Sequence, residues 1–155
     1  MDAYNIELRS HDIATLANGK WLNDEIINMY ANMITNRNTS EPGRYPRVHM
    51  FNTFFYSHLR DNGDKGYDKV KRWTKKFDLF ACKYVLVPVH LGMHWCCAVI
   101  NFDKKRIEYY DSLLSSNAQC ISLLRNYLDK EHRDKKNTPF DLKGWTNYTP
   151  TVRCT

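Results

Sequence analysis

The sequence predicts an α+β domain in which helices come first, antiparallel strands follow and a further helix comes after them. Three observations predict it: an apolar helical period near the N-terminus, short apolar strands in the middle, and a return to helical spacing after residue 116. Hydrophobic residues make up 43% and aromatic residues 14% of the 155 residues, which is enough for one apolar core. No internal repeat or low-complexity segment interrupts the chain, so we expect one domain or a large part of one.

The N-terminal third favours helices. Residues 10–18 are expected to form a short helix capped by Ser10, and a longer helix is expected to begin at Asn23 or Asp24. The polar stretch 36–47 contains Pro and Gly and predicts a loop, after which the aromatic-rich residues 51–60 predict another helix. The inward positions of the first two helices are expected to be Ile13 and Leu16, and then Ile26, Ile27, Tyr30, Met33 and Ile34.

The middle of the chain favours strands. Residues 84–89 and 94–102 are apolar runs, and residues 106–110 alternate in polarity after a polar turn at 103–105. Residues 116–131 then return to helical spacing. The polar tail from Asp134 has three large apolar anchors, which are Phe140, Leu142 and Trp145.

The chain is basic, with 23 Lys and Arg against 17 Asp and Glu and a net charge of +6. Such an excess attracts acidic partners, either nucleic acid or an acidic protein, but an ordinary solvated surface is an equally open interpretation. Residues 69–76 (KVKRWTKK) are the densest basic run and are expected to be helical and partly exposed. The N-terminus lacks the apolar run of a signal peptide, and no segment approaches the ~20 apolar residues of a membrane span, so we expect a soluble intracellular protein.

The cysteines predict neither a disulfide framework nor a zinc site, because their number is odd and none has C-x-x-C spacing. Cys96 and Cys97 lie in an apolar run and are expected to be inert core thiols in a reducing compartment. His90 precedes His94 by four residues, but residues 91–92 turn between them and no third ligand is near in sequence. We therefore expect no metal and no other cofactor. The five cysteines are Cys82, Cys96, Cys97, Cys120 and Cys154.

Two polar residues stand at the ends of neighbouring predicted strands. His94 begins one strand and Asp111 follows the end of the next. If residues 103–105 form a tight hairpin, the strands are antiparallel and the two side chains lie side by side at the sheet edge. A carboxylate in that position can fix the tautomer of the imidazole, as in a Cys-His-Asp triad. A purely structural hydrogen-bonded pair is the alternative.

Five segments carry a wider pattern: residues 21–28 (WLNDEIIN), 51–56 (FNTFFY), 70–76 (VKRWTKK), 90–95 (HLGMHW) and 109–112 (YYDS). In this order they resemble the ubiquitin-like protease family, and in particular its SUMO-specific (sentrin-specific) branch. The resemblance implies a papain-like cysteine protease fold and a thiol peptidase that matures SUMO or removes it from conjugated proteins. It also suggests the nucleus as location. Membrane partners are not expected, and nucleic acid is disfavoured.

The resemblance assigns roles to individual residues. His94 matches the family's general base and Asp111 its orienting partner. Trp21 and Trp95 match two indoles that roof a narrow tunnel over the Gly-Gly tail of the substrate. Only residues without a Cβ can pass between flat rings at backbone distance, which agrees with a glycine tail. Without the motif, either tryptophan would be equally well explained as an ordinary core residue.

Three further residues match the family's contacts with SUMO. Asp24 matches an acidic residue that pairs with a basic residue of SUMO, although it could act only as a helix cap. Arg72 and Lys75 match basic residues that face the acidic surface of SUMO, and a solvated basic face is their alternative. A related branch cleaves another ubiquitin-like protein, but residues 72–73 resemble the SUMO branch more.

The last catalytic element of the family, a Gln followed later by Asp-Cys-Gly, has no match in this sequence. Cys154 follows Arg153 and has no helix after it, so we do not expect it to be the nucleophile. We therefore expect an incomplete catalytic domain over residues 1–155, without the C-terminal helical part and inactive as given. The missing helix would expose several apolar side chains, each worth ~1.5–3 kcal/mol, against a net stability of ~5–15 kcal/mol. The alternatives are a non-catalytic SUMO-binding module and a basic nucleic-acid-binding protein.

Overall fold

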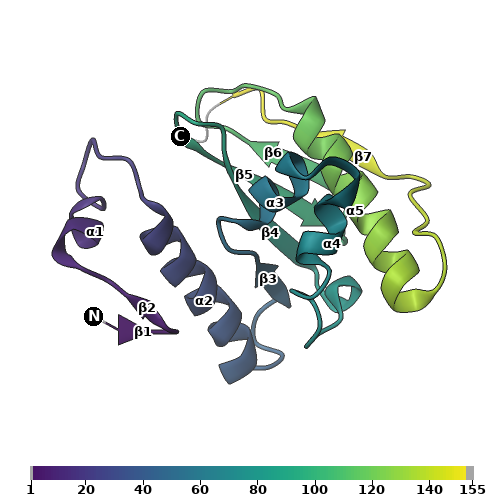
Figure 1. Cartoon of the computed structure of the whole chain (residues 1–155), viewed down its shortest axis with the longest axis horizontal. Coiled ribbons are helices and arrows are strands. Elements are labelled where there is room, and N and C mark those ends of the chain that lie inside the picture. Colours follow the sequence, from purple (N-terminus) through teal and green to yellow (C-terminus); the bar gives the residue numbers. More distant parts are fainter. Residues whose placement is uncertain (1, 153–155) are drawn as a thin grey trace.

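The computed structural model describes residues 2–152 and is built around one mixed sheet of five strands (Figure 1). The strand order is β3-β4-β5-β6-β7, antiparallel in the middle and parallel at both edges. These strands are Val48–Met50 (β3), Tyr84–His90 (β4), Trp95–Asn101 (β5), Arg106–Tyr110 (β6) and Thr146–Tyr148 (β7), and the short pair Asp2–Ala3 (β1) and Ile6–Glu7 (β2) stands apart. The helices are Ser10–Ala14 (α1), Asp24–Ser40 (α2), Phe55–Asp61 (α3), Gly66–Val70 (α4) and Ala118–Lys136 (α5), with 3-10 turns at Gly63–Lys65 (η1) and Leu79–Ala81 (η2).

The three central strands agree with the predicted antiparallel sheet, and the α+β class is confirmed. They form because apolar residues point alternately into the core, as the fully buried Val85, Val87 and Val89 do in β4. Two tight reversals connect them, and Gly92 in the first has a φ of 89°, which a residue without a Cβ adopts without strain. In the second hairpin Cys97 of β5 pairs with Tyr110 of β6, so the beginning of β5 lies beside the end of β6.

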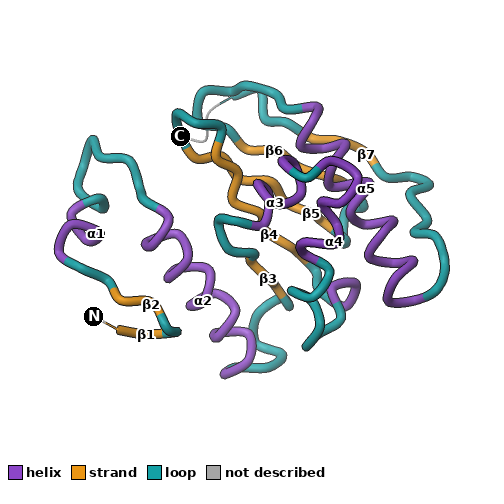
Figure 2. The backbone as a smooth tube through the Cα atoms, viewed as in Figure 1, coloured by secondary structure: helices purple, strands orange, loops and turns teal. Residues whose placement is uncertain are grey.

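The main core lies between this sheet and the helices α3, α4 and α5, which share one side of the sheet in Figure 1. The rings of Phe51 and Phe55 stack there with centroids 3.7 Å apart. Two of the expected anchors of the tail, Phe140 and Trp145, pack against this core. Both belong to the segment between α5 and β7, which is a long loop (Figure 2). The helix α2 lies beyond β3, with a second small apolar cluster of its own.

The first helix differs from its prediction. It ends at Ala14, its N-cap is Arg9 rather than Ser10, and Ile13 is 45% exposed instead of facing inward. Leu16, in the turn after the helix, is likewise exposed. The inward position belongs to Asp12, whose carboxylate accepts hydrogen bonds from the Arg9 backbone N–H (2.8 Å) and from Asn23 Nδ2 (2.7 Å). A buried carboxylate satisfied by these groups turns the apolar face of the helix outward.

The second helix begins as predicted but ends later. Asn23 is its cap, because its side chain accepts a hydrogen bond from the Ile26 backbone N–H, and Asp24 is its first helical residue. The loop predicted from residue 36 begins only after Ser40. Polar side chains such as those of Asn38 and Ser40 donate to carbonyls four residues earlier, so their polar atoms are satisfied within the helix. Tyr30 and Met33 on the expected inward face are exposed.

The helix predicted at 51–60 begins only at Phe55 and ends at Asp61. The helix predicted at 69–76 is wrong beyond its first two residues, because α4 ends at Val70 and residues 71–76 are turns. The edge strands β3 and β7 were not predicted, because each has three residues and is held by pairing with a strand distant in sequence. No helix in the described part of the chain is long and apolar enough to cross a membrane.

Candidate active site

The hairpin of β5 and β6 brings His94 and Asp111 into direct contact. His94 comes just before β5 and Asp111 just after β6, and His94 Nε2 lies 2.7 Å from Asp111 Oδ1. The backbone N–H of Leu113 donates to the same carboxylate oxygen at 2.8 Å. The expected contact is therefore present, and the antiparallel register produces it.

The contact sets the charge of Asp111 and the tautomer of His94. Burial by itself raises the pKa of Asp111, but the hydrogen bonds from Leu113 and His94 outweigh it and hold the pKa below its ordinary value. The carboxylate is thus ionised and only accepts, so Nε2 of His94 carries the proton of this hydrogen bond. Nδ1 of His94 is buried and has no hydrogen-bond partner among the described residues. The arrangement leaves Nδ1 as the basic nitrogen.

An aromatic pocket of about 340 Å³ opens beside this pair. Trp21 is 58% exposed and meets the His94 ring edge to face, with centroids 5.7 Å apart. The indole N–H of Trp95 donates to the Leu22 carbonyl at 2.9 Å, which joins β5 to the segment before α2. The lining residues are Lys20, Trp21, Leu22, His94, Trp95, Ser112 and Leu113.

An apolar groove of about 400 Å³ adjoins the aromatic pocket, with Leu22 and Trp95 lining both. It separates the N-terminal helices from one face of the sheet. Its lining residues are Leu16, Leu22, Ile26, Ile27 and Tyr30 on one side, and Met50, Pro88, Trp95, Cys96, Cys97 and Tyr110 on the other.

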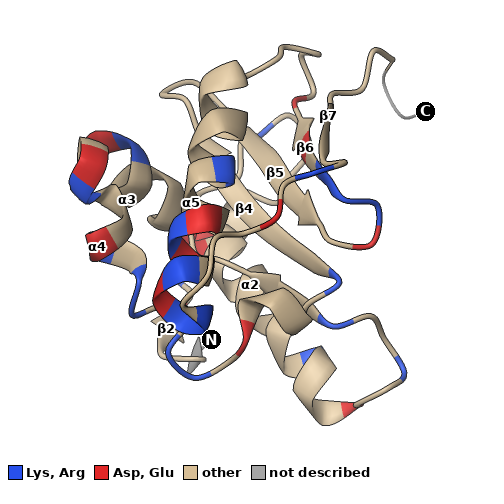
Figure 3. Ribbon diagram, turned by 90° about the vertical axis from the view of Figure 1, so that its right-hand side faces the viewer, with Lys and Arg blue, Asp and Glu red and all other residues tan. Residues whose placement is uncertain are grey.

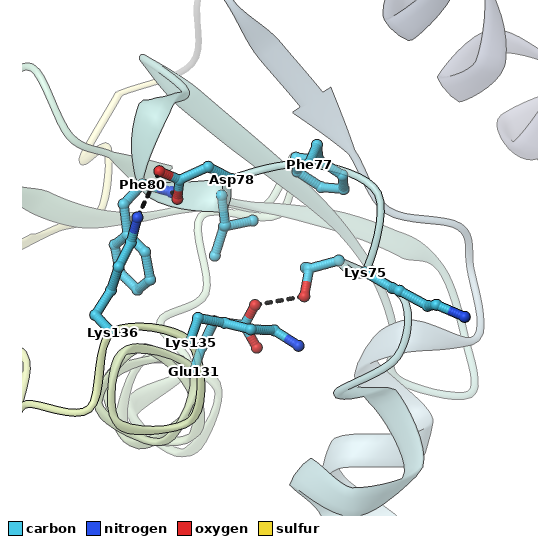
Figure 4. Close-up of a pocket in the computed structure, with 9 residues that line it drawn as sticks. Lys75, Phe77, Asp78, Phe80, Glu131, Lys135 and Lys136 are labelled. Atoms are coloured by element: carbon cyan, nitrogen blue, oxygen red, sulfur yellow. Dashed lines mark hydrogen bonds and ion pairs between the residues drawn. The ribbon is translucent and has the colours of Figure 1, made fainter.

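The structure does not bring all the predicted binding residues together. Asp24 is half-buried and lies close in sequence to Trp21, at the start of α2. Arg72 and Lys75 are exposed in the turns after α4. Lys75 lines a different pocket, of about 350 Å³, beside Lys135 of α5 (Figure 4), and this pocket shares no residue with the one that contains His94. If Arg72 and Lys75 bind the same partner as His94, that partner must be large.

The described cysteines are not placed to act on Nδ1 of His94. Burial raises the pKa of the thiols of Cys82 and Cys96, that of Cys97 to about 11 and that of Cys120 to about 12. Cys96 Sγ contacts His94 through Nε2, at 3.4 Å. Cys154 lies outside the described residues.

Sequence reasoning missed the contact between Cys96 and His94. A signal was available, since residues i and i+2 of an extended segment point to the same side. His90 does not join this cluster. Its ring packs on Trp95 with centroids 4.5 Å apart, and its Nδ1 accepts a hydrogen bond from the Gly92 backbone N–H at 3.3 Å.

A histidine hydrogen-bonded to a buried carboxylate beside a pocket has the geometry of the base in Ser-His-Asp and Cys-His-Asp sites. Residues 20–153 match the model of the Ulp1 protease family, C-terminal catalytic domain. The chain therefore belongs to the Ulp1 protease family, and the resemblance seen in the sequence is confirmed.

Relatives and solved structures agree with this assignment. The chain is 51% identical over 146 residues to a sentrin-specific protease of Caenorhabditis elegans, covering 94% of this chain and 20% of that protein. It is 40% identical over 147 residues to human sentrin-specific protease 2, covering 95% and 24%. An X-ray structure of the C-terminal Ulp1 protease domain in complex with Smt3, the yeast ortholog of SUMO, superposes with a TM-score of 0.70 at 31% identity, covering 96% of this chain and 63% of that one. A de-sumoylating protease gives a TM-score of 0.76 at 26% identity, covering 91% and 58%. The chain thus spans about a quarter or less of the length of the two sentrin-specific proteases.

Proposed function

We propose that this chain provides the substrate-binding surface and the His94–Asp111 base of a SUMO-specific cysteine peptidase, which matures SUMO or removes it from conjugated proteins. The observation that carries the proposal is the 2.7 Å contact between His94 and Asp111, beside a pocket formed by Trp21 and Trp95. The Ulp1 domain bound to Smt3 superposes on 96% of this chain, which supports SUMO as the partner.

The chemistry follows from the orientation of His94. In a complete site, Nδ1 would take the proton of a cysteine thiol, and the sulfur would attack the carbonyl carbon at the C-terminal glycine of SUMO. The leaving amine would receive that proton from His94, and water would then hydrolyse the thioester with His94 again as base. Asp111 would hold Nε2–H throughout and stabilise the imidazolium.

The binding pocket favours a flat, narrow substrate. Trp21 is mostly exposed, and a glycine tail could lie against its ring and that of Trp95 without the steric cost of a Cβ. We assign Asp24, close in sequence to the pocket, to a polar contact with SUMO, and Arg72 and Lys75 to its acidic surface. SUMO is large enough for these residues to contact it at separate places.

We propose that the 155-residue chain binds SUMO without cleaving it, because none of the cysteines in residues 2–152 reaches Nδ1 of His94. The basic charge gives little support to nucleic-acid binding. In Figure 3 acidic and basic residues alternate on α5, and cations such as Lys136 and Arg133 are paired with Asp78 and Asp129, both at 2.8 Å. Nuclear location stays a prediction.

Binding and cleavage are tested separately on the 155-residue chain. Titration calorimetry with SUMO is expected to show binding. Trp21→Ala should weaken this binding on the order of tenfold or more, because tryptophans that become buried in a complex contribute much of its binding energy. Phe54→Ala is the matched control, because it removes an exposed aromatic ring that lines neither the aromatic pocket nor the apolar groove. It is expected to leave the affinity for SUMO within about twofold of the unmodified chain. Absence of SUMO binding, with steeply salt-dependent DNA binding instead, would overturn the proposal.

A fluorogenic substrate with the SUMO C-terminus tests cleavage. No turnover is expected from the unmodified chain, from His94→Ala or from Cys154→Ala. Turnover that disappears in Cys154→Ala would show that Cys154 completes the site and that the chain is an active peptidase.

A further inference from the structure

We propose that His94, Cys96 and Asp111 form a binding site for Zn²⁺ or another thiophilic divalent metal ion. The ligand atoms of these three side chains all lie within 4.8 Å of one another. Imidazole, thiolate and carboxylate are the three side-chain ligands that zinc uses in proteins. The metal site stands independently of the proposed function, and only its consequence for SUMO cleavage rests on that function.

The distance between His94 Nε2 and Cys96 Sγ suits tetrahedral coordination. Zinc bonds of about 2.0–2.3 Å at tetrahedral angles separate neighbouring ligand atoms by about 3.3–3.8 Å. His94 Nε2 and Cys96 Sγ are 3.4 Å apart, inside this range. Nε2 and Asp111 Oδ1 are 2.7 Å apart as hydrogen-bonding partners, so the carboxylate must move by less than about 1 Å to become a ligand.

A second observation concerns the carboxylate of Asp111. The side chain of Asp111 is fully buried, yet its Oδ2 has no hydrogen-bond partner among residues 2–152. A buried carboxylate oxygen without a partner loses free energy, and a bound cation would satisfy it. The Leu113 backbone N–H holds the other oxygen, which would orient this carboxylate towards a metal ion as an outer-shell hydrogen bond does.

The site has a route of entry. The side chain of His94 is 15% exposed and lines the aromatic pocket, so an ion arriving through that pocket meets the imidazole first. Three protein ligands leave the fourth position for water or for an anionic group. Metal binding at Nε2 moves the single ring proton of the neutral imidazole to Nδ1 and releases the thiol proton of Cys96 to solvent, so affinity rises with pH.

Metal binding and the hydrogen bond of the base exclude each other. A metal ion on Nε2 replaces the proton that Asp111 now accepts, and the imidazole then cannot be both ligand and oriented base. Thiophilic metal ions at this site are therefore expected to inhibit a peptidase that uses His94, and chelation is expected to reverse the inhibition. Mg²⁺ and Ca²⁺ prefer oxygen ligands and are expected to have no effect.

Cobalt titration of the 155-residue chain tests the site. Co²⁺ is expected to produce a thiolate-to-metal charge-transfer band that Zn²⁺ displaces. Cys96→Ser should abolish the band and weaken Co²⁺ binding on the order of tenfold or more, by loss of a ligand. Cys97→Ser, the neighbour on the opposite face of β5, and Cys154→Ser should retain it. A band that survives in Cys96→Ser, or that is missing from the unmodified chain, would overturn the proposal.

A second measurement does not depend on the Cys96 variant folding. Histidine side-chain NMR signals should show that Zn²⁺ shifts His94 far more than His90 or His58, and that Mg²⁺ shifts none of them. Equal shifts at all three histidines would contradict a defined site. Neither measurement uses SUMO, so failure here leaves the proposed function standing.

Discussion

His94 Nε2 lies 2.7 Å from Asp111 Oδ1 although the two residues are 17 positions apart in the chain. The pairing of Cys97 with Tyr110 sets this distance, because it aligns the beginning of β5 with the end of β6. The base of the proposed peptidase is thus a product of hairpin register. A shift of one residue in that register would turn His94 to the other face of the sheet.

Asp111→Asn tests what the carboxylate does for His94. The amide can donate or accept, so Nε2–H is no longer favoured and long-range nitrogen–proton NMR should show His94 changing from one tautomer to a mixture. Loss of the buried charged hydrogen bonds should lower the free energy of unfolding by about 1–3 kcal/mol at pH 7 in urea denaturation.

The pH dependence of this loss has a definite sign. The pKa of Asp111 is below its ordinary value of 3.8, so its contribution is present above that pH and disappears as pH falls through the folded-state pKa. Asp103→Asn, in the exposed turn of the same hairpin, is the matched control and should change stability by less than about 0.5 kcal/mol. Equal effects of the two variants would show that the His94 contact carries no special stability.

Trp95 connects the sheet to the segment before α2 through its indole N–H and the Leu22 carbonyl. Trp95→Phe keeps an aromatic ring but removes the donor, and should cost about 0.5–1.5 kcal/mol. Trp95→Ala removes the ring as well and should weaken SUMO binding on the order of tenfold or more. Limited proteolysis should cut residues 15–22 faster in both variants than in the unmodified chain. Unchanged proteolysis would show that this hydrogen bond does not hold the segment.

The parts of the fold that the sequence predicted are those with a strong local period. Val85, Val87 and Val89 alternate into the core, and their strand was predicted with almost the same bounds. The edge strands β3 and β7 were missed because pairing with distant strands forms them, and three residues carry no readable period. Burial of Asp12 reversed the expected inward face of α1, since a carboxylate satisfied by backbone and Asn23 is invisible to an apolar pattern.

The site was predicted more completely than the helices around it. His94 and Asp111 were paired by strand order alone, because antiparallel neighbours must meet at one edge. The contact of Cys96 with His94 was missed, because the thiol was interpreted only by its apolar neighbours. The contacts of Arg72 and Lys75 depend on the surface of a partner protein, and the sequence pattern of this chain does not contain that surface.

Glu131 of α5 is 1% exposed and holds the turns after α4 against the helix. Its carboxylate accepts hydrogen bonds from the hydroxyl of Thr74 and from Tyr67, the latter at 2.7 Å, at the wall of the pocket in Figure 4. Thr74→Val preserves shape but leaves a buried carboxylate oxygen without this donor, so thermal or urea unfolding should show a loss of about 1–3 kcal/mol. Thr39→Val, at an exposed position of α2, should stay within about 0.5 kcal/mol. A small effect at Thr74 would mean that water replaces the hydroxyl.

His49 of β3 makes stability sensitive to mild acid. Its ring packs against Phe51 and Phe77, with centroids 4.6 Å and 4.3 Å away, and burial lowers its pKa from 6.5 to about 4. Near pH 6 His49 therefore binds a proton in the unfolded chain but not in the folded chain, so the free energy of unfolding falls as pH decreases from 6.5 towards 4. Between pH 7 and pH 5 the loss should be about 1–2 kcal/mol, measured by urea denaturation at each pH. His49→Leu should remove most of this slope, whereas His58→Gln, at an exposed position, should retain it. If the slope persists in His49→Leu, another group governs acid sensitivity and β3 tolerates a charged ring.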